Sequence, residues 1–194
     1  MNEYEEAWAQ LERLADWYCD KQGNRNEATT RFQMIDRLLF EVLGWGRDDI
    51  VLEEAQDAEY ADYTIIVPRR ILILEAKREG EYFEIAMGKD RLIYNLSTLM
   101  RDNKNLEAAI HQVAQYCQKR GVPYALVSNG HQLVCFLASR NDGMSPFDGR
   151  AIVFVSFEHM LQEFPALWKM LSKRGLEQKA LHEQLVGEAQ AKVP

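Results

Sequence analysis

The stretch ILILEAK at positions 71–77 ends an apolar run with a carboxylate and an ammonium group, and it follows YADY at positions 60–63 after a short turn. Side chains two residues apart in a β-strand point to the same face, so Glu75 and Lys77 share a face while Ala76 faces the opposite layer. An unbroken apolar run is typical of a central strand buried on both faces, where charged groups are costly. The two charges therefore indicate a functional site at the end of this strand.

The two stretches predict a β-hairpin whose register brings a second carboxylate to the same place. Pro68-Arg69 lies between them, and proline suits the second position of a type I turn. A pairing that is symmetric about this turn sets Thr64 opposite Ile73. Two steps further along, Asp62 lies opposite Glu75. Directly paired residues have Cβ atoms about 5 Å apart, which is close enough for two carboxylates to share a divalent cation.

Plainer interpretations of these residues stay open at this point. Asp62 could form an ordinary ion pair with Lys77, and Lys77 could be an end-of-strand charge that extends its head to solvent. A Glu-x-Lys pattern also arises often by chance. The register with Asp62 and the apolar run before Glu75 favour the functional interpretation.

Further blocks accompany the hairpin. The stretch NEATTR at 26–31 opens a helix that runs through Leu43, with Asn26 as its N-cap. Glu27 then lies in the first turn, where the helix dipole stabilises a carboxylate, so capping alone explains it. Gln112 and Tyr116 are one turn apart on a later helix and share a face. This pair could equally be a plain polar contact at a helix edge. The stretch VSNG at 127–130 follows.

Together these blocks resemble the PD-(D/E)xK nuclease superfamily, and more narrowly the N-terminal nuclease domain of type I restriction enzyme R subunits. They occur in the expected order over about residues 25–140, with Ala61 in place of the proline of the family name. The resemblance implies an α/β, restriction-endonuclease-like fold with a mixed central sheet flanked by helices. It also implies a metal-dependent endonuclease, a Mg²⁺-dependent phosphodiesterase that hydrolyses DNA in restriction or anti-phage defence.

The resemblance further implies a catalytic set and a metal-binding set, namely Asp62, Glu75, Lys77, Glu27 and Gln112 for catalysis, and Asp62, Glu75, the backbone carbonyl of Ala76, and Glu27 for the metal. Lys77 would orient the attacking water or stabilise charge on the phosphorane, and Gln112 would orient a ligand, water or the DNA backbone. Hard oxygen ligands select Mg²⁺, with Mn²⁺ as a substitute, rather than zinc. Such a cation polarises the phosphate and lowers the pKa of a bound water.

The composition is that of one soluble globular domain, with 194 residues, 47% hydrophobic and 27% charged. No stretch approaches the roughly 20 apolar residues of a membrane span, and the acidic N-terminus is neither a secretory signal nor a transit peptide. Three cysteines without a C-x-x-C pair indicate reduced thiols rather than a zinc site or a disulfide framework. We therefore expect a cytoplasmic protein with no membrane partner.

The net charge of −7 opposes tight DNA binding by this chain alone, because phosphate neutralisation supplies most of that affinity. The basic residues gather in short groups, at Arg69-Arg70, Lys77-Arg78, Lys89 with Arg91, Arg101 with Lys104, and Lys119-Arg120. We expect weak intrinsic affinity and delivery of DNA by a partner subunit or a further domain, either a motor or a DNA-recognition module. No Walker A motif or base-reading module is recognisable. Since one site cuts one strand, a double-strand break needs a homodimer or two nicks.

Periodicity and turn residues predict one α/β domain over residues 1–160, which the resemblance makes a PD-(D/E)xK nuclease-like domain. They also predict a helical extension over 161–194, or a connection to a further domain. We expect helices at 3–19, 26–43, 82–102 and 105–119, a helix from Ser156 that Phe164-Pro165 interrupts, and a polar helical stretch at 167–193. The expected strands lie at 50–53, 124–128, 133–137 and 152–155, besides the hairpin.

Two other functions stay open on the sequence. The acidic charge favours a non-catalytic interaction module that keeps the nuclease fold, although the full set of candidate residues argues against it. An RNase or a repair nuclease on the same fold is the other alternative, because the metal site acts on the phosphodiester and does not read the sugar.

Overall fold

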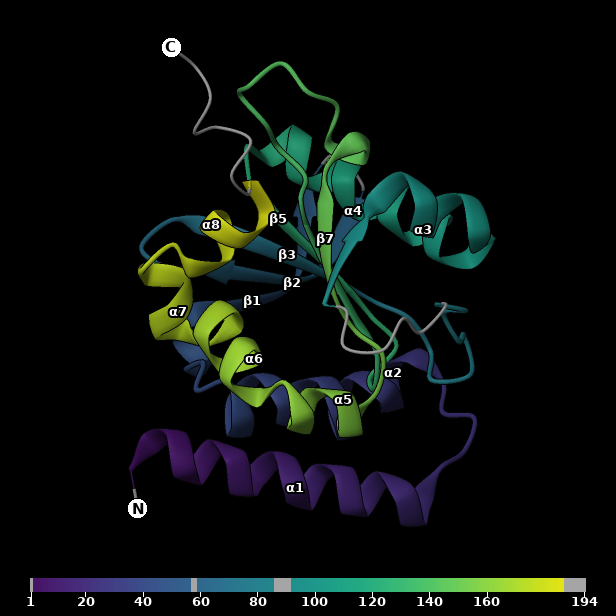
Figure 1. Cartoon of the computed structure of the whole chain (residues 1–194), viewed down its shortest axis with the longest axis vertical. Coiled ribbons are helices and arrows are strands. Elements are labelled where there is room, and N and C mark those ends of the chain that lie inside the picture. The colour runs from purple at the N-terminus through teal and green to yellow at the C-terminus, as the bar shows by residue number, and fades with distance from the viewer. Residues whose placement is uncertain (1, 57–58, 86–91, 187–194) are drawn as a thin grey trace.

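The computed structural model describes residues 2–56, 59–85 and 92–186, and it is built on a seven-stranded mixed sheet (Figure 1). The strand order is β1-β2-β3-β5-β6-β7-β4. Neighbouring strands pair antiparallel except for β3 and β5, which are parallel. The strands are β1 (Ile50–Gln56), β2 (Glu59–Ile66), β3 (Arg70–Ala76), β4 (Ile93–Asn95), β5 (Tyr124–Ser128), β6 (Leu133–Leu137) and β7 (Arg150–Phe154).

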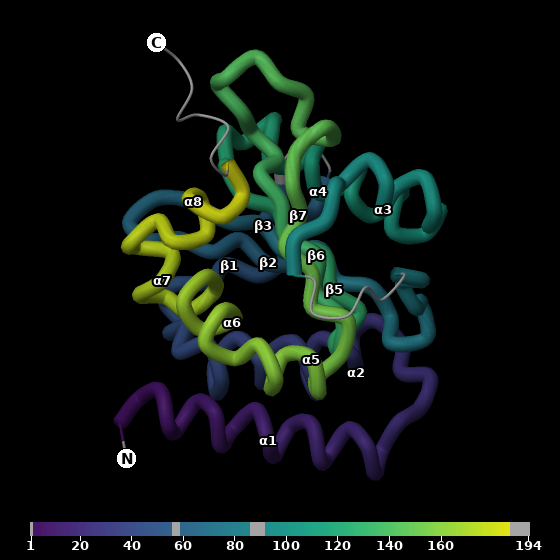
Figure 2. The backbone as a smooth tube through the Cα atoms, viewed as in Figure 1, coloured from purple at the N-terminus to yellow at the C-terminus, as the bar shows by residue number. Residues whose placement is uncertain are grey.

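Helices cover both faces of the sheet and make a mixed α/β fold, as the sequence predicts (Figures 1 and 2). One face carries α1 (Glu3–Lys21), the helical segment 27–42, α5 (Phe157–Gln162), α6 (Phe164–Leu171), α7 (Lys173–Glu177) and α8 (Ala180–Val186). The other face carries α3 (Leu96–Asp102) and α4 (Lys104–Arg120). Two short 3₁₀ turns are η3 (Arg47–Asp49) and η4 (Pro146–Asp148).

The helical segment 27–42 begins and ends where the sequence places it. Asn26 caps it by accepting a hydrogen bond from the Thr29 amide at 2.8 Å. Gly44 ends it with a φ of 72°, which glycine adopts without strain. Between these ends it consists of α2 (Glu27–Thr30) and two π-helical turns, η1 (Arg31–Ile35) and η2 (Leu38–Val42). Single π turns are frequent at functional sites, because they rotate the side chains that follow.

The register of the β2–β3 hairpin confirms the sequence prediction at its centre. Thr64 pairs with Ile73, and Tyr63 pairs with Leu74. A bulge between Ile65 and Ile66 makes the turn asymmetric, contrary to the symmetric pairing expected there. The ladder ends at Tyr63 and Leu74, so the direct pairing predicted for Asp62 and Glu75 is not among the described pairs, and Asp62 instead accepts from the Ala76 amide.

The helix expected over residues 82–102 is wrong at residues 82–85, which are not helical, and at Ile93–Asn95. Strand β4 occupies Ile93–Asn95 and pairs with β7, and only Leu96–Asp102 form a helix, α3. Residues 86–91, which include Lys89 and Arg91, lie outside the described residues. The short strand is stabilised by its long-range pairing with β7, which a helical periodicity in the local sequence does not report.

The first strand is also longer than expected. It continues through Glu53 to Gln56 and pairs with β2, so the acidic stretch 53–56 is strand rather than loop. Cross-strand ion pairs compensate its charge, since Glu54 accepts from the guanidinium of Arg70 on β3. The acidic character of a segment therefore did not exclude it from the sheet.

The C-terminal helices share the core of the sheet. Leu167, Leu171, Leu181 and Leu185 are buried in the same cluster as residues of β6 and β7. The predicted connection to a further domain stays a prediction. Within the described residues, no helix combines the length and the apolar character that a membrane crossing needs.

Candidate active site

The candidate site lies at the carboxyl end of the parallel strand pair. Ala76 pairs with Ser128 at the ends of β3 and β5, and the Lys77 amide continues this ladder by donating to the Ser128 carbonyl at 2.7 Å. Ligand sites of α/β sheets occur at the carboxyl ends of parallel strands, where strands end and loops diverge. The position of the site thus follows from the topology.

Glu75 and Lys77 point to the same face and form an ion pair. Lys77 Nζ lies 2.8 Å from Glu75 Oε1, and the two side chains are 15% and 5% exposed. Lys77 is therefore neither an ordinary partner of Asp62 nor a charge that reaches out to solvent. The pair is held in the interior, where it needs compensation from its surroundings.

Helix α4, which packs on the face of β3 that carries Ile73, supplies that compensation. Gln112 Oε1 accepts a hydrogen bond from Lys77 Nζ at 3.1 Å, and Gln112 Nε2 donates to the Tyr116 hydroxyl at 3.1 Å. The predicted one-turn spacing of Gln112 and Tyr116 is thereby confirmed, and Gln112 lies beside Lys77. Its role at an active site stays a prediction. The tyrosine fixes the amide, and the amide fixes the ammonium group.

Asp62 joins the site through the backbone of β3 and through Arg31. Its Oδ2 accepts a hydrogen bond from the Ala76 amide at 2.8 Å, and its Oδ1 lies 3.3 Å from Arg31 Nη1. Burial raises the pKa of the Asp62 carboxyl, while the Ala76 amide and Arg31 oppose that rise. It is the amide of Ala76 that Asp62 engages, and a role of the Ala76 carbonyl as a metal ligand stays a prediction.

Glu27 lies at the rim of the same site, in the first turn of α2. Its side chain is exposed, yet partial desolvation and the nearby negative charge of Asp62 raise the pKa of its carboxyl, against the influence of Lys77 and Arg31. Asn26 already provides the cap of the helix, so Glu27 is not needed for capping. Hydrogen bonds connect Glu75, Lys77 and Gln112, and Asp62 joins them through the Ala76 amide, whereas only this electrostatic influence links Glu27 to the site. The predicted role of Glu27 at the metal stays a prediction.

Glu75 carries the strongest signal of function in this cluster. Burial raises the pKa of its carboxyl to about 7, with Lys77 opposing the rise and the charges of Asp62 and Glu27 adding to it. Its Oε1 accepts from Lys77, but its Oε2 is buried and has no hydrogen-bond partner among the described residues. A buried acceptor without a partner is rare in folded proteins and costs about 1–3 kcal/mol.

The oxygen atoms of this cluster fit a hard divalent cation. Glu75 Oε2 has no hydrogen-bond partner among the described residues, and the carboxylate of Asp62 can accept further bonds beyond its two contacts. Hard oxygen donors of this kind suit Mg²⁺ or Mn²⁺. Among the described residues no three Asp, Glu, His or Cys side chains gather as a ready-made metal cluster, so such a cation would take the two carboxylates with backbone or water oxygens.

Arg31 is a site residue to which the sequence prediction gave no role. It begins the first π turn, one helical turn after Glu27, and its guanidinium carbon lies 5.1 Å from the ring centroid of Tyr63. The Tyr63 hydroxyl donates to Asp36 Oδ1 at 2.8 Å, which fixes the ring beneath the guanidinium. The spacing of Glu27 and Arg31 by four residues was the available signal, because such residues share a helix face.

Several of the basic residues that the sequence places in short groups are neutralised within the molecule. Lys119 Nζ lies 2.8 Å from Glu59 Oε2, and Arg120 Nη2 donates to the Glu54 carbonyl at 2.7 Å. Arg70 on β3 pairs with the carboxylate of Glu54 on β1, across the intervening strand β2. These charges are committed to the edge of the sheet and do not form a free basic surface there.

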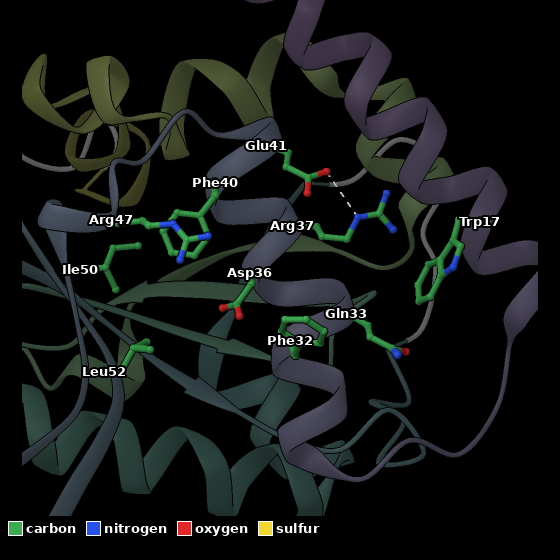
Figure 3. Close-up of a pocket in the computed structure, with 10 residues that line it drawn as sticks. All are labelled: Trp17, Phe32, Gln33, Asp36, Arg37, Phe40, Glu41, Arg47, Ile50 and Leu52. Atoms are coloured by element: carbon green, nitrogen blue, oxygen red, sulfur yellow. Dashed lines mark hydrogen bonds and ion pairs between the residues drawn. The ribbon is translucent and has the colours of Figure 1, made fainter.

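A separate pocket of about 700 Å³ lies on the outer side of the helical segment 27–42 (Figure 3). Phe32, Asp36 and Phe40 face β1, and Arg37 and Glu41 face the side of α1. Cation–π contacts line it, with Arg37 over Trp17 at 5.2 Å and Arg47 over Phe40 at 5.6 Å. The remaining lining residues are Gln33, Ile50 and Leu52. None of the predicted catalytic residues lines this pocket.

No family model, no curated protein and no solved structure matches this chain. The chemistry of the site has to follow from its own residues.

Proposed function

We propose that this chain is a Mg²⁺-dependent phosphodiesterase that cleaves DNA, with Mn²⁺ as a substitute cation. The observation that carries the proposal is the buried, partnerless Oε2 of Glu75 beside Lys77 and Asp62. Burying an unsatisfied carboxylate oxygen lowers stability, so its retention at the carboxyl end of the interior strand β3 favours a ligand that binds it. The ligand that suits such an oxygen is a hard cation.

Each residue then has a defined task. Asp62 and Glu75 would hold the cation, which supplies charge stabilisation at the phosphate and a more acidic bound water. Lys77 donates to the Glu75 carboxylate and to Gln112, so its ammonium group is held where it can orient water or stabilise charge on the phosphorane. Gln112 is held by Tyr116 and accepts from Lys77, so the ammonium group of Lys77 keeps its position when a substrate binds.

Glu27 is placed to act at the solvent side of the site. Its raised pKa is caused by desolvation and by Asp62, so it lies within the electrostatic range of the metal-binding carboxylates. A second carboxylate at the rim can order water molecules around the cation. This role agrees with the one that the family resemblance implies.

DNA is the substrate we favour, on the resemblance to PD-(D/E)xK nucleases in restriction and anti-phage defence. The mixed sheet with helices on both faces suits a restriction-endonuclease-like fold. Net charge −7 and the neutralised basic groups support weak intrinsic affinity, so a partner subunit or a further domain would deliver the substrate.

The test is metal titration by calorimetry on the wild type and on Asp62→Ala, with plasmid nicking assayed on the same samples. We expect Mg²⁺ or Mn²⁺ binding that the variant loses, together with nicking that requires the metal. Asp142→Ala is the matched control, because Asp142 is a carboxylate paired with Arg140 in the loop after β6, at the opposite end of the strands. Metal binding without nicking would point to a site that waits for DNA delivery.

If the wild type does not bind the metal, the proposal that this chain is an enzyme is wrong, and an interaction module on the same fold is favoured. If metal-dependent cleavage is found, matched DNA and RNA oligonucleotides decide between a DNase and an RNase. Cleavage of RNA alone would contradict the substrate proposed here but not the metal site.

A further inference from the structure

One nitrogen of Arg31 divides its hydrogen bonding between two carboxylates. Arg31 Nη1 lies 3.1 Å from Glu53 Oε1 and 3.3 Å from Asp62 Oδ1. The side chains of Arg31 and Asp62 are each 16% exposed, whereas that of Glu53 is 67% exposed. The guanidinium group thus bridges a partly buried carboxylate of the site and a carboxylate in solvent.

The backbone of Glu53 is strained at this bridge. Its φ of 50° is in the left-handed region, which residues other than glycine rarely adopt. On either side of it β1 and β2 pair regularly, Leu52 with Tyr63 and Glu54 with Ala61, so the interrupted position is the one opposite Asp62. Strain of this kind is often retained at functional sites. Here it accompanies a second carboxylate within reach of Arg31.

The aromatic support of Arg31 allows a small movement between the two carboxylates. The guanidinium carbon lies 5.1 Å from the ring centroid of Tyr63, and the ring is anchored by the hydrogen bond to Asp36. A cation–π contact is attractive over a range of positions above the ring, unlike a hydrogen bond. Arg31 can therefore exchange one carboxylate for the other without losing this support.

We propose that Arg31 is a built-in counter-cation, which holds Asp62 while the divalent cation is absent and shifts onto Glu53 when the cation binds. The inference rests on the proposed metal site and adds its regulation. A guanidinium and a divalent cation on the same carboxylate repel each other. Glu53 receives the displaced charge, so that the repulsion is relieved without unfolding the site.

The test is the affinity for Mn²⁺ alone, measured by calorimetry and by the loss of the free Mn²⁺ paramagnetic signal, without nucleic acid. Arg31→Ala should bind Mn²⁺ about tenfold more tightly, because the competing charge is gone. Glu53→Gln should bind about threefold more weakly, because Arg31 then has no second carboxylate to accept it. The two variants move the affinity in opposite directions.

The matched control is Arg37→Ala. Arg37 belongs to the same helical segment, contacts an aromatic ring and pairs with Glu41, but it lies in the pocket of Figure 3 rather than at the carboxylates. The affinity of the Arg37→Ala variant for Mn²⁺ should equal that of the wild type. Thermal unfolding of every variant separates a change at the site from a change in folding. If Arg31→Ala does not fold, Arg31→Lys replaces it. We then expect a smaller increase in affinity for Mn²⁺.

A bracing role for Arg31 would overturn the inference, and it predicts that both variants bind Mn²⁺ more weakly and unfold at lower temperature. Unchanged affinity in Arg31→Ala would overturn it as well. Both outcomes leave the proposed function intact as long as the wild type binds Mn²⁺. If the wild type does not bind Mn²⁺, the proposed metal site itself fails, and the inference fails with it.

Discussion

The carboxylate site and the pocket of Figure 3 use the same helical segment but treat charge in opposite ways. At the site, Glu75 and Lys77 are withdrawn from solvent, with side chains 5% and 15% exposed. At the pocket, Arg37 and Glu41 pair in solvent, with side chains 26% and 44% exposed. Solvated ion pairs contribute little to stability and have a small desolvation penalty, whereas buried ion pairs have a large penalty that well-placed hydrogen-bond partners must offset.

Packing of the helix accounts for the charges at the pocket but not for those at the site. The pocket can be explained as the outer, amphipathic side of a packed helix, where arginine guanidinium groups stack on aromatic rings. The site cannot, because replacing its buried charges by apolar side chains would remove the desolvation penalty and the unsatisfied oxygen. We therefore expect substitutions at the site to change chemistry and substitutions at the pocket to change little.

The largest effect is expected for Lys77→Ala, which should lower cleavage by about 10²–10³-fold or more. Folding should survive, because the pKa of Glu75 is already about 7 and its carboxyl can take up a proton when the ammonium group is lost. Cleavage would be measured as plasmid nicking, and folding by circular dichroism.

Lys173→Ala is the matched control, since Lys173 also pairs with a carboxylate, Asp49, at 2.8 Å, but outside the site. Full activity in Lys77→Ala would show that the site is assigned wrongly. Loss of activity in both variants would mean that the assay reports stability.

The second prediction concerns the pH dependence of stability. Because the pKa of Glu75 is raised from 4.5 to about 7, the folded state holds more protons than the unfolded state between these values. Stability due to this group is therefore present below about pH 4.5 and falls as the pH rises through 7. The loss amounts to about 2–3 kcal/mol.

Urea unfolding at several pH values in EDTA, on the wild type and Glu75→Gln, isolates this contribution. We expect the free energy of unfolding of the wild type to fall relative to that of the variant as the pH rises. Parallel pH profiles would contradict the assignment of the raised pKa to Glu75. Added Mg²⁺ should restore the wild type at high pH, because the cation binds the ionised carboxylate.

The third prediction concerns Glu27, for which we expect a 10–100-fold loss of activity or metal affinity in Glu27→Gln. Stability should change by less than about 1 kcal/mol, because only a helix-dipole contribution is lost and Asn26 keeps the cap. Glu107→Gln, in the first turn of α4, makes the same change of charge away from the site. A change confined to thermal stability would mean that Glu27 serves the helix alone.

The elements that the sequence predicts well are those stabilised by local patterns. The hairpin register at Thr64 and Ile73 follows from pairing outward from the proline turn, and the Gln112–Tyr116 pair follows from the helical period. Because these patterns lie within the segments themselves, the sequence alone indicates the candidate carboxylates and Lys77.

The parts that the sequence does not predict depend on contacts between distant segments. Strand β4 exists through its pairing with β7, about 57 residues later, and its own residues continue a helical periodicity. The bridge from Arg31 to Glu53 and Asp62 spans 22 and 31 residues. Nothing in the residue type of Glu53 signals a positive φ, so this strained position is visible only in the structure.

The smallest effect is expected at the pocket, where Phe32→Ala should leave the free energy of unfolding within about 0.5 kcal/mol of the wild type. Phe32 is 72% exposed, so little buried area is lost. Metal affinity and nicking should also be unchanged, because Phe32 lines the pocket of Figure 3, which none of the candidate catalytic residues lines. Measured beside Lys77→Ala, this variant tests the comparison directly. If Phe32→Ala lowered nicking while metal affinity stayed constant, the exposed ring would contact the substrate, and the pocket would belong to the path of the nucleic acid.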